Sequence, residues 1–498
     1  MKPVEPFIPA PAEHPGHTIT REQFFNLFAA VFLPMFMAAV DQTLLATATP
    51  VIAESLGGLR DTSWIAVAYL LASAVIVPAY GRYGDMKGRR NMLVVALVIF
   101  ALGSVACAAA QSLPQLVAGR ILQGLGGGGL MTLSQALIGE LVPPRERVRF
   151  QGYFAIIFTS ASVGGPVIGG LVVSHFSWRW LFLANLPFTA FALWRLSKLP
   201  PGERHAQPPG NGDIAGIALF FVGALSALFW LTSVGHRFSW SSTASIVLLL
   251  LACIALGGLF WHESRHGAPF LPIDLLRQPT IKYSAMTIAL FAACMFAMVF
   301  FLPIYLQIGH HFSPAASGLL LLPLTGGMVI AALSSGRILS RTGEPRRIPM
   351  IGMAISSVAL CLLGVLPGYT AVVAILGFIA GAGFGTVMPI MQVVIQTVAG
   401  RPRLGAVTAV ASLARSIGAA LGAAVFGALA FALMPEAGMR ALTLPGASDL
   451  NDSVLRAFHH AFLFAAAAAA LAAFTASRVP HMTLWSRRNP RAKDPPPS

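Results

Sequence analysis

The sequence predicts an all-α membrane protein with fourteen transmembrane helices. Of its 498 residues, 56% are hydrophobic and only 10% are charged, whereas a soluble globular chain has about 25% charged residues. Apolar runs long enough to cross a bilayer, which takes ~20 residues, recur along the whole chain. Because these runs are continuous rather than alternating, they exclude a transmembrane β-barrel.

The apolar runs divide the chain into two six-helix bundles and an inserted helical pair. We expect helices at about 25–49, 62–81, 91–110, 114–139, 150–174, 179–198, 213–234, 243–262, 282–308, 314–338, 348–367, 370–396, 405–433 and 457–477. The predicted organisation is an N-terminal segment (1–24), an N-terminal bundle (25–198), a linker (199–212), the inserted pair (213–262), a second linker (263–281), a C-terminal bundle (282–477) and a tail (478–498).

Lysine and arginine positions give the expected orientation. If the N-terminus is cytoplasmic, 26 of the 33 basic residues fall on the cytoplasmic side, 5 on the opposite side and 2 within spans. Cytoplasmic loops carry such an excess, so both termini are expected in the cytoplasm. The same rule accounts for the formal charge of +15 without nucleic-acid binding.

The first span contains a carboxylate, Asp41. A charge at that depth costs at least ~2.5–3.5 kcal/mol, so a chain keeps one where it faces a partner or a polar cavity. Arg120, in the fourth span, is expected at a similar depth. A buried opposite charge favours ionised Asp41, while desolvation favours its protonated form. We therefore hypothesise that Asp41 carries protons; a static structural ion pair remains the alternative.

A loop motif follows the second span and recurs after the tenth, at 336–343, 255 residues further on. Duplicated halves are typical of transporters. The first copy reads Gly81-Arg-Tyr-Gly-Asp85-Met-Lys-Gly88-Arg89-Arg90.

Asp85 in this loop could cap a neighbouring helix or pair with Arg89 or Arg90, and so latch one conformation of a rocking protein. The plainer alternative is a basic loop that only sets topology.

The motifs together resemble the major facilitator superfamily, and within it the fourteen-span drug:proton antiporters. The resemblance covers nearly the whole chain in order. It rests on the loop motif and on Asp41-Gln-Thr43 with Pro50, Arg120-Ile-Leu-Gln123-Gly124, Gly164-Gly165-Pro166-Val-Ile-Gly169-Gly170, Trp178-Arg179-Trp180-Leu-Phe182 with Asn185-Leu-Pro187, and Pro303-Ile-Tyr305-Leu-Gln307.

The resemblance implies a major facilitator fold and a proton-driven multidrug exporter of the cytoplasmic membrane that needs no cofactor. The two bundles would rock about a central site by alternating access, and the Gly165-Pro166-Gly169-Gly170 motif implies export. That motif also permits a helix bend, although plain small-residue packing would explain it too. Two positions depart from the family pattern: Ala46 replaces an asparagine, and Ser340 stands where the first loop has Asp85.

We expect the substrate site near the midplane between the two bundles. Aromatic, methionine and amide side chains suit bulky hydrophobic or cationic compounds, although packing or lipid contact is an equal alternative for these residues. The expected lining residues are Trp64, Tyr69, Gln123, Phe158, Phe300, Tyr305, Gln307, Met388, Gln392 and Arg415. A single intramembrane carboxylate predicts few protons per cycle and monovalent or neutral cargo.

Two other functions remain as alternatives. The same fold could export a specific endogenous solute such as a lipid, siderophore or metabolite. A membrane metallopeptidase could use His262, Glu263 and His266, which fit the H-E-x-x-H pattern, although no metal site is expected here. The expected partners are small molecules, protons and the lipid bilayer, with a periplasmic adaptor if the host has two membranes.

Overall fold

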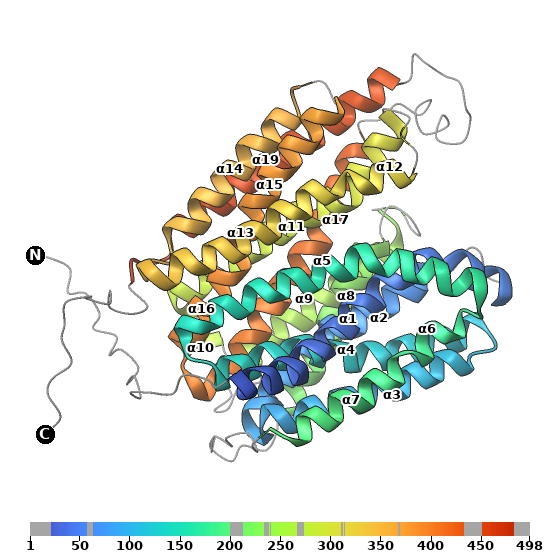
Figure 1. Cartoon of the computed structure of the whole chain (residues 1–498), viewed down its shortest axis with the longest axis vertical. Coiled ribbons are helices and arrows are strands. Elements are labelled where there is room, and N and C mark those ends of the chain that lie inside the picture. Colours follow the sequence, from blue (N-terminus) through green and yellow to red (C-terminus); the bar gives the residue numbers. More distant parts are fainter. Residues whose placement is uncertain are drawn as a thin grey trace, which may run out of the picture.

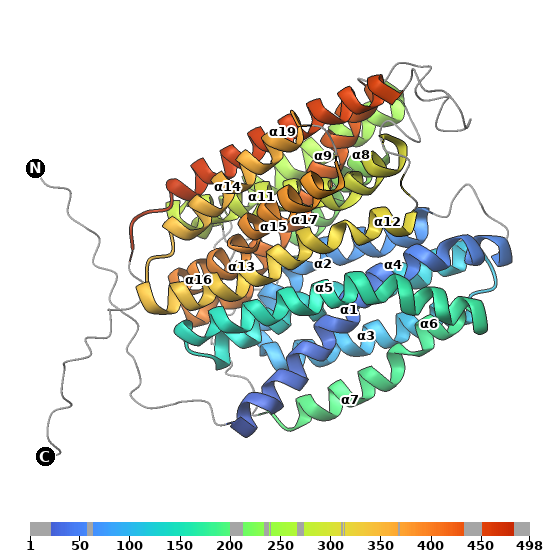
Figure 2. The same cartoon turned by 45° about the horizontal axis from the view of Figure 1, so that its top comes forward.

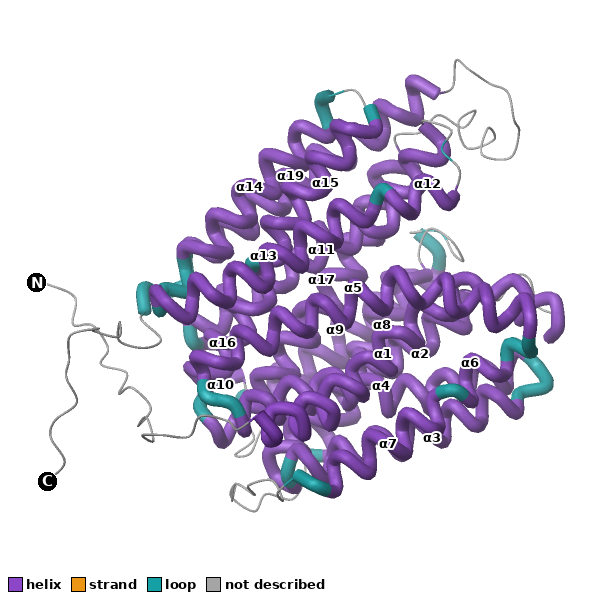
Figure 3. Tube along the Cα trace, viewed as in Figure 1, coloured by secondary structure: helices purple, strands orange, loops and turns teal. Residues whose placement is uncertain are grey.

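The computed structural model describes residues 21–56, 63–199, 213–233, 239, 241–265, 273–309, 312, 314–366, 369–432 and 451–482. Over these residues the chain is helical, with loops and turns between the helices (Figure 3). His266 of the H-E-x-x-H pattern is not among the described residues.

The N-terminal bundle contains seven helical segments: α1 (Arg21–Leu56), α2 (Ser63–Lys87), α3 (Arg89–Ala109), α4 (Leu113–Leu141), α5 (Pro144–His175), α6 (Arg179–Leu183) and α7 (Asn185–Ser197). In it α4 packs against α2 and α3, and α1 packs against α5. Glycines of α4 allow this close packing, since a Cβ on Gly126 would overlap the backbone of Phe100 in α3. In this bundle one expected span, 179–198, is divided into α6 and α7 at Ala184.

The C-terminal bundle follows the short helix α10 (Ile273–Arg277). It contains α11 (Pro279–Gly309), α12 (Pro314–Leu319), α13 (Leu321–Thr342), α14 (Arg347–Leu363), α15 (Thr370–Gly385), α16 (Val387–Ala399), the 3-10 turn η2 (Arg401–Arg403), α17 (Leu404–Ala432) and α19 (Asn451–Ser477). Figures 1 and 2 show the two bundles side by side, and in the view of Figure 1 they are close together near α16 and further apart towards α12. The bundles meet as two helix pairs, α2 on α17 and α5 on α13.

The inserted pair consists of α8 (Ile214–Ser233) and α9 (Thr243–Glu263). Helix α8 contacts both α2 and α17, so it covers the line where the two bundles meet. Phe220, Ala224 and Leu228 of α8 form an apolar cluster there with Leu71 and Val75 of α2. Since α2 and α17 belong to different bundles, the pair is part of the junction rather than a separate domain.

Local signals explain where several helices begin and end. Helix α13 ends at Gly343, whose left-handed backbone (φ 69°) suits glycine and lets its N–H bond to the carbonyl of Leu339. Helix α9 begins after Ser242, whose hydroxyl accepts a hydrogen bond from the N–H of Ser245. Gly88 separates α2 from α3 with a φ of 91°.

Eight helical stretches of the described chain are long and apolar enough to cross a membrane, and three further apolar helices are shorter. The eight are Trp64–Lys87, Arg89–Ala109, Thr243–Glu263, Pro279–Gln307, Ala316–Thr342, Thr370–Ala399, Arg401–Gly422 and Leu455–Ser477. The helical membrane-protein class predicted from the sequence is therefore confirmed, and the count of fourteen spans stays a prediction.

Candidate functional site: a buried carboxylate–guanidinium centre and an inter-bundle latch

A buried ion pair lies inside the N-terminal bundle. Arg120 Nη1 of α4 lies 2.6 Å from Asp41 Oδ2 of α1, and the two side chains are 1% and 4% exposed. Another edge of the guanidinium also makes a hydrogen bond, because Nε donates to the carbonyl of Ile65 in α2 at 3.0 Å. A buried pair is stable only when further hydrogen bonds satisfy both partners, and this site supplies them.

Amide side chains complete the surroundings of Asp41. Gln123 Nε2 donates to Asp41 Oδ1 at 2.9 Å, and Gln123 Oε1 accepts from Arg120 at 2.6 Å. Asn185 Nδ2 of α7 lies 3.5 Å from the same Asp41 oxygen, and Ser104 of α3 accepts from both amides. Side chains of α4 and α7 thus contact the carboxylate on α1, and Ser104 of α3 holds the two amides that orient it.

Aromatic rings close this centre. The ring of Tyr69 lies 4.3 Å from the guanidinium carbon of Arg120, and the ring of Phe182 lies 5.9 Å from it. A cation over a ring face is stabilised, more so when it is desolvated. Helices α3 and α4 meet tightly beside it, because a Cβ on Gly103 would overlap the backbone of Gln123.

The loop motif forms a latch between the bundles. Asp85 accepts hydrogen bonds from the N–H groups of Gly405 and Ala406, at 2.8 and 2.9 Å, in the first turn of α17. A carboxylate at a helix N-terminus satisfies unpaired N–H groups and complements the helix dipole. Asp85 also pairs with Arg89 at 2.6 Å.

Arg89 links Asp85 to two further groups. Its Nη1 lies 2.6 Å from Glu140 of α4, and its Nη2 donates to the carbonyl of Arg401, next to α17, at 2.8 Å. Gly81 is required beside this site, because a Cβ there would lie 2.7 Å from the carbonyl oxygen of Gly405. We call Asp85, Arg89, Glu140 and the start of α17 the latch.

A polar layer lies further along the same inter-bundle seam. Gln396 of α16 donates to the carbonyl of Gln135 in α4 and to Thr408 of α17, at 3.3 and 3.1 Å. Thr132 of α4 and Ser412 of α17 approach to 3.5 Å. The layer also contains Gln392 and Arg415, one of which is fully buried and the other half-buried.

The family model of the Major Facilitator Superfamily matches residues 31–423. The chain belongs to this superfamily. It is a major facilitator transporter and not an enzyme, which confirms the family predicted from the motifs.

Several curated relatives are similar over most of this facilitator. A multidrug transporter of Bacillus subtilis is 34% identical over 405 residues, which are 81% of this chain and 74% of the relative. An efflux pump of Pseudozyma antarctica is 34% identical over 411 residues, 80% of this chain and 76% of the pump. An uncharacterized transporter of Mycobacterium tuberculosis is also 34% identical, over 407 residues, and the match spans 81% of this chain and 59% of that relative's length.

Solved structures show the same fold. The human organic anion transporter MFSD10 superposes with a TM-score of 0.63 and 16% identity, covering 91% of this chain and 99% of that one. The proton:xylose symporter XylE gives a TM-score of 0.62 and 13% identity, covering 93% and 97%. The two-bundle major facilitator fold is therefore established for this facilitator.

The expected pocket residues of this facilitator fall into separate groups. Tyr69 and Gln123 belong to the Asp41 centre, while Gln392 and Arg415 lie at the inter-bundle seam. Trp64 instead stacks on Phe229 of α8, at 5.2 Å between ring centres, and so faces the inserted pair.

The other expected pocket residues of the facilitator lie within or around the C-terminal bundle. Tyr305 is 1% exposed and packs on Phe458 and Phe462. Gln307 donates to Ser317 at 2.9 Å. Met388 packs against the bundle core, whereas Phe300 is 54% exposed. The side chain of Phe158 lies outside the described positions. The helical period of a sequence does not reveal which neighbouring helix a residue faces. The expected pocket residues therefore lie in several different places in the structure.

The glycine-rich motif of α5 lies in a helix assigned without interruption from Pro144 to His175. Gly165 and Gly169 are buried. A Cβ on Gly170 would meet nothing within 4 Å, so no neighbour requires that glycine. The side chain of Pro166 lies outside the described positions, and the expected bend remains a prediction.

Arg90 does not join Asp85. Its Nε and Nη2 donate to the carbonyls of Leu196 and Ser197 at the end of α7, at 2.9 and 3.2 Å. Of the two arginines offered as partners for Asp85, the structure therefore selects Arg89. Arg90 satisfies unpaired carbonyls of a helix C-terminus instead.

The H-E-x-x-H pattern does not form a zinc site on one helix. Helix α9 ends at Glu263, one residue after His262, and His262 Nε2 lies 2.7 Å from the buried carboxylate Asp213 Oδ1. Two histidines one turn apart on a continuing helix are what such a site needs. No group of three potential metal ligands occurs among the described residues. The metallopeptidase alternative is wrong, as the family also shows.

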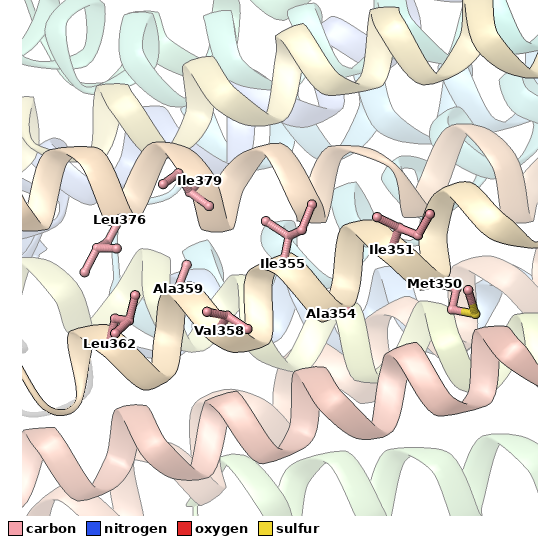
Figure 4. A pocket seen from close by; sticks show the side chains of 9 residues that line it. All are labelled: Met350, Ile351, Ala354, Ile355, Val358, Ala359, Leu362, Leu376 and Ile379. Carbon is pink, nitrogen blue, oxygen red and sulfur yellow. The ribbon is translucent and has the colours of Figure 1, made fainter.

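An apolar groove of about 410 Å³ lies on α14 and α15 (Figure 4). All its lining side chains are apolar, among them Ile351, Val358 and Ile379. It contains none of the expected substrate-binding residues, because α14 and α15 lie behind α13 and α16 relative to the seam.

The sequence did not predict several residues of these sites. The tertiary fold brings Asn185 to Asp41 and Ser104 to Asn185, and it brings Glu140 to Arg89 across 51 residues. The sequence contains a sign of two of these residues. Asn185 belongs to the Asn185-Leu-Pro187 motif, and Glu140 is an acidic residue shortly before the basic loop at 145–149.

Proposed function

We propose that this facilitator is a proton-driven exporter of hydrophobic and amphiphilic compounds, with fourteen spans and both termini in the cytoplasm. The buried pair of Asp41 and Arg120 carries this proposal. The names of similar proteins, a multidrug transporter and an efflux pump, support export. The driving force is the proton gradient across the cytoplasmic membrane, without a cofactor.

Asp41 is the proton-carrying group in this proposal. Protonation removes its charge, so that Arg120 loses its ion pair and keeps the hydrogen bonds to Ile65 and Gln123. Because a buried charge without its partner is strongly destabilised, protonation favours a different packing of α1 and α4. Asp41 binds a proton when open to the outside and releases it when open to the cytoplasm, and the change in packing couples the proton to export.

The distribution of basic residues supports the orientation. The latch lies where Arg89, Arg147 and Arg401 gather, on the side that the sequence assigns to the cytoplasm. The latched structure is then closed towards the cytoplasm. Gly165 and Pro166 of α5 are proposed to let that helix bend as the bundles rock.

Transport into vesicles with an imposed pH gradient tests the proposal. Wild-type protein should concentrate a lipophilic dye when the gradient is present and stop when it is dissipated. Asp41→Asn should lose gradient-driven transport, because it cannot change charge. Glu344→Gln makes the same carboxyl-to-amide change at a surface ion pair with Arg347, and should transport as the wild type does.

Continued gradient-driven transport by Asp41→Asn would refute proton coupling at this residue. Growth of a pump-deficient host on a drug panel then separates drug export from export of an endogenous solute. Host cells with two membranes, with and without their adaptor proteins, show whether an adaptor is needed.

A further inference from the structure

Arg415 is a membrane-embedded cation without a carboxylate partner among the described residues. It lies in α17, at a depth of ~16 Å from the start of that helix at 1.5 Å per residue. Its one hydrogen bond within the described chain goes to the thioether sulfur of Met131, at 3.9 Å. Thioether sulfur is a weak acceptor, so no described residue balances the guanidinium charge.

Two buried arginines differ sharply from Arg415. Arg120 is paired with Asp41, and Arg89 is paired with Asp85 and Glu140, each at 2.6 Å. These two guanidinium groups are neutralised by carboxylates, whereas Arg415 has no carboxylate partner among the described residues.

Gln392 supplies a second, independent observation. Its side chain is fully buried in α16, and neither the oxygen nor the nitrogen of its amide has a hydrogen-bond partner among the residues that the structure describes. Gln396, one turn away on the same helix, is held by Gln135 and Thr408. Buried amides are almost always satisfied, so an amide left free at the seam indicates a ligand that bonds to it.

The two groups lie at the same level of the seam. Gln396 contacts Gln135 of α4. Met131 lies one turn before Gln135 on α4, and Arg415 contacts Met131. One turn along α16 from Gln396, in the same direction, is Gln392. Ser134 of α4, also fully buried, has a hydroxyl without a partner.

We propose that the exported compounds carry an anionic headgroup, such as a carboxylate, that binds Arg415 and the amide of Gln392. An arginine fork matches the geometry of a carboxylate and forms strong charge-assisted bonds with it. The described residues of this layer include no carboxylate to attract a cation. This inference rests on the proposed export function and replaces the expectation of cationic cargo.

Anionic cargo has an energetic consequence. Exchange of one internal monovalent anion for one external proton moves two positive charges inward in each cycle. A potential that is negative inside therefore drives the exchange in addition to the pH gradient. Exchange of one monovalent cation for one proton moves no net charge, so the membrane potential would not affect it.

Binding of matched probes to the full-length protein in nanodiscs tests the headgroup. Three dansyl-labelled alkyl probes share one apolar body and end in a carboxylate, a primary amide or a trimethylammonium group, with empty nanodiscs as the control. Wild-type protein should bind the carboxylate most tightly. Arg415→Gln should weaken carboxylate binding at least about tenfold and change amide binding by less than about twofold. Arg415→Lys keeps the charge and should keep the order of preference.

Two results would overturn the proposal. One is tighter binding of the ammonium probe than of the carboxylate probe by wild-type protein. The other is equal weakening of all three probes by Arg415→Gln, which would mean that Arg415 only supports the structure. If Arg415→Gln does not fold, Arg415→Lys and the three-probe order of the wild type decide the question.

A failure here is distinguishable from a failure of proton coupling. Asp41→Asn should lose gradient-driven transport yet bind the carboxylate probe with the wild-type preference. If proton coupling is wrong, Asp41→Asn still transports, whereas an error about the headgroup appears in the probe order alone.

Discussion

The latch should control which conformation the transporter occupies, and Asp85→Asn is its most direct perturbation. The Asp85 carboxylate accepts the N–H groups of Gly405 and Ala406 and pairs with Arg89. These contacts cross from the N-terminal to the C-terminal bundle. They must break when the bundles part at this end, so Asp85 stabilises the latched conformation selectively.

The size of the effect follows from these contacts. Hydrogen bonds to a charged group contribute about 1.5–3 kcal/mol each, and an asparagine oxygen can keep one of the two bonds to α17. Loss of the other bond and of the charge at the helix N-terminus, which contributes about 0.3–1 kcal/mol, gives a total of about 2–4 kcal/mol. That total corresponds to a shift of about 30- to 700-fold in the ratio of latched to open protein.

Distance measurements between two spin labels can detect this shift. Lys87 and Arg403 are exposed and lie on the two sides of the latch, so labels at Lys87→Cys and Arg403→Cys report its opening. The exposed Cys253 and Cys361 would first be replaced by serine. Asp85→Asn should move the distribution to longer distances, and Glu344→Gln should leave it unchanged.

An unchanged distribution in Asp85→Asn would contradict the latch. In Asp85→Asn the ion pair between Arg89 and Glu140 remains and could keep the latch closed. An unchanged distance distribution in Arg89→Gln as well, which removes the partner of both Asp85 and Glu140, would exclude that explanation. Asp85 would then only set the topology of its loop, which is the plainer alternative considered for this motif.

Two further predictions concern stability. Gly103→Ala should lower the melting temperature, because its Cβ would overlap the backbone of Gln123 and such overpacking costs about 1–3 kcal/mol; an unchanged melting temperature would mean that α3 and α4 separate freely. His262→Ala should lose about 1 kcal/mol of stability with its hydrogen bond to Asp213, while export continues and metal analysis finds no zinc in either protein. Export that depended on zinc bound at His262 would show that this reasoning is wrong.

The sequence predicted the features that depend on local pattern and depth. Apolar length located the helices, since a bilayer imposes the same minimum on each span. Similar depth in two helices that run in opposite directions predicted that Asp41 and Arg120 could meet, and the structure places them in contact. Asp85 was expected at a helix N-terminus or beside an arginine, and it occupies both positions.

The features that the sequence could not predict depend on helix rotation and on the order of helices in space. Tyr305 and Trp64 have the composition of pocket residues, yet one lies in a bundle core and the other against the inserted pair. The sequence also could not show that α8 would cover the junction of α2 and α17. Each of these outcomes is set by packing between segments far apart in the chain, for which a hydrophobic period gives no direction.

Helix α4 provides the physical connection between the proton site and the proposed substrate site. It carries Arg120, which holds Asp41, and Met131, which touches Arg415. These two residues are separated by about 16 Å along the helix axis at 1.5 Å per residue. Further along, α4 carries Glu140, which holds Arg89 in the latch. A small displacement of α4 would therefore reach all three sites at once.

This arrangement makes a rigid α4 sufficient for coupling, because a packed helix transmits a shift along its length. In the proposed mechanism, protonation of Asp41 would weaken the hold of α1 on Arg120, an anion at Arg415 would change the contact at Met131, and the latch would respond at Glu140. All three contacts are made by α4. A transporter built in this way needs no contact between the proton and its cargo.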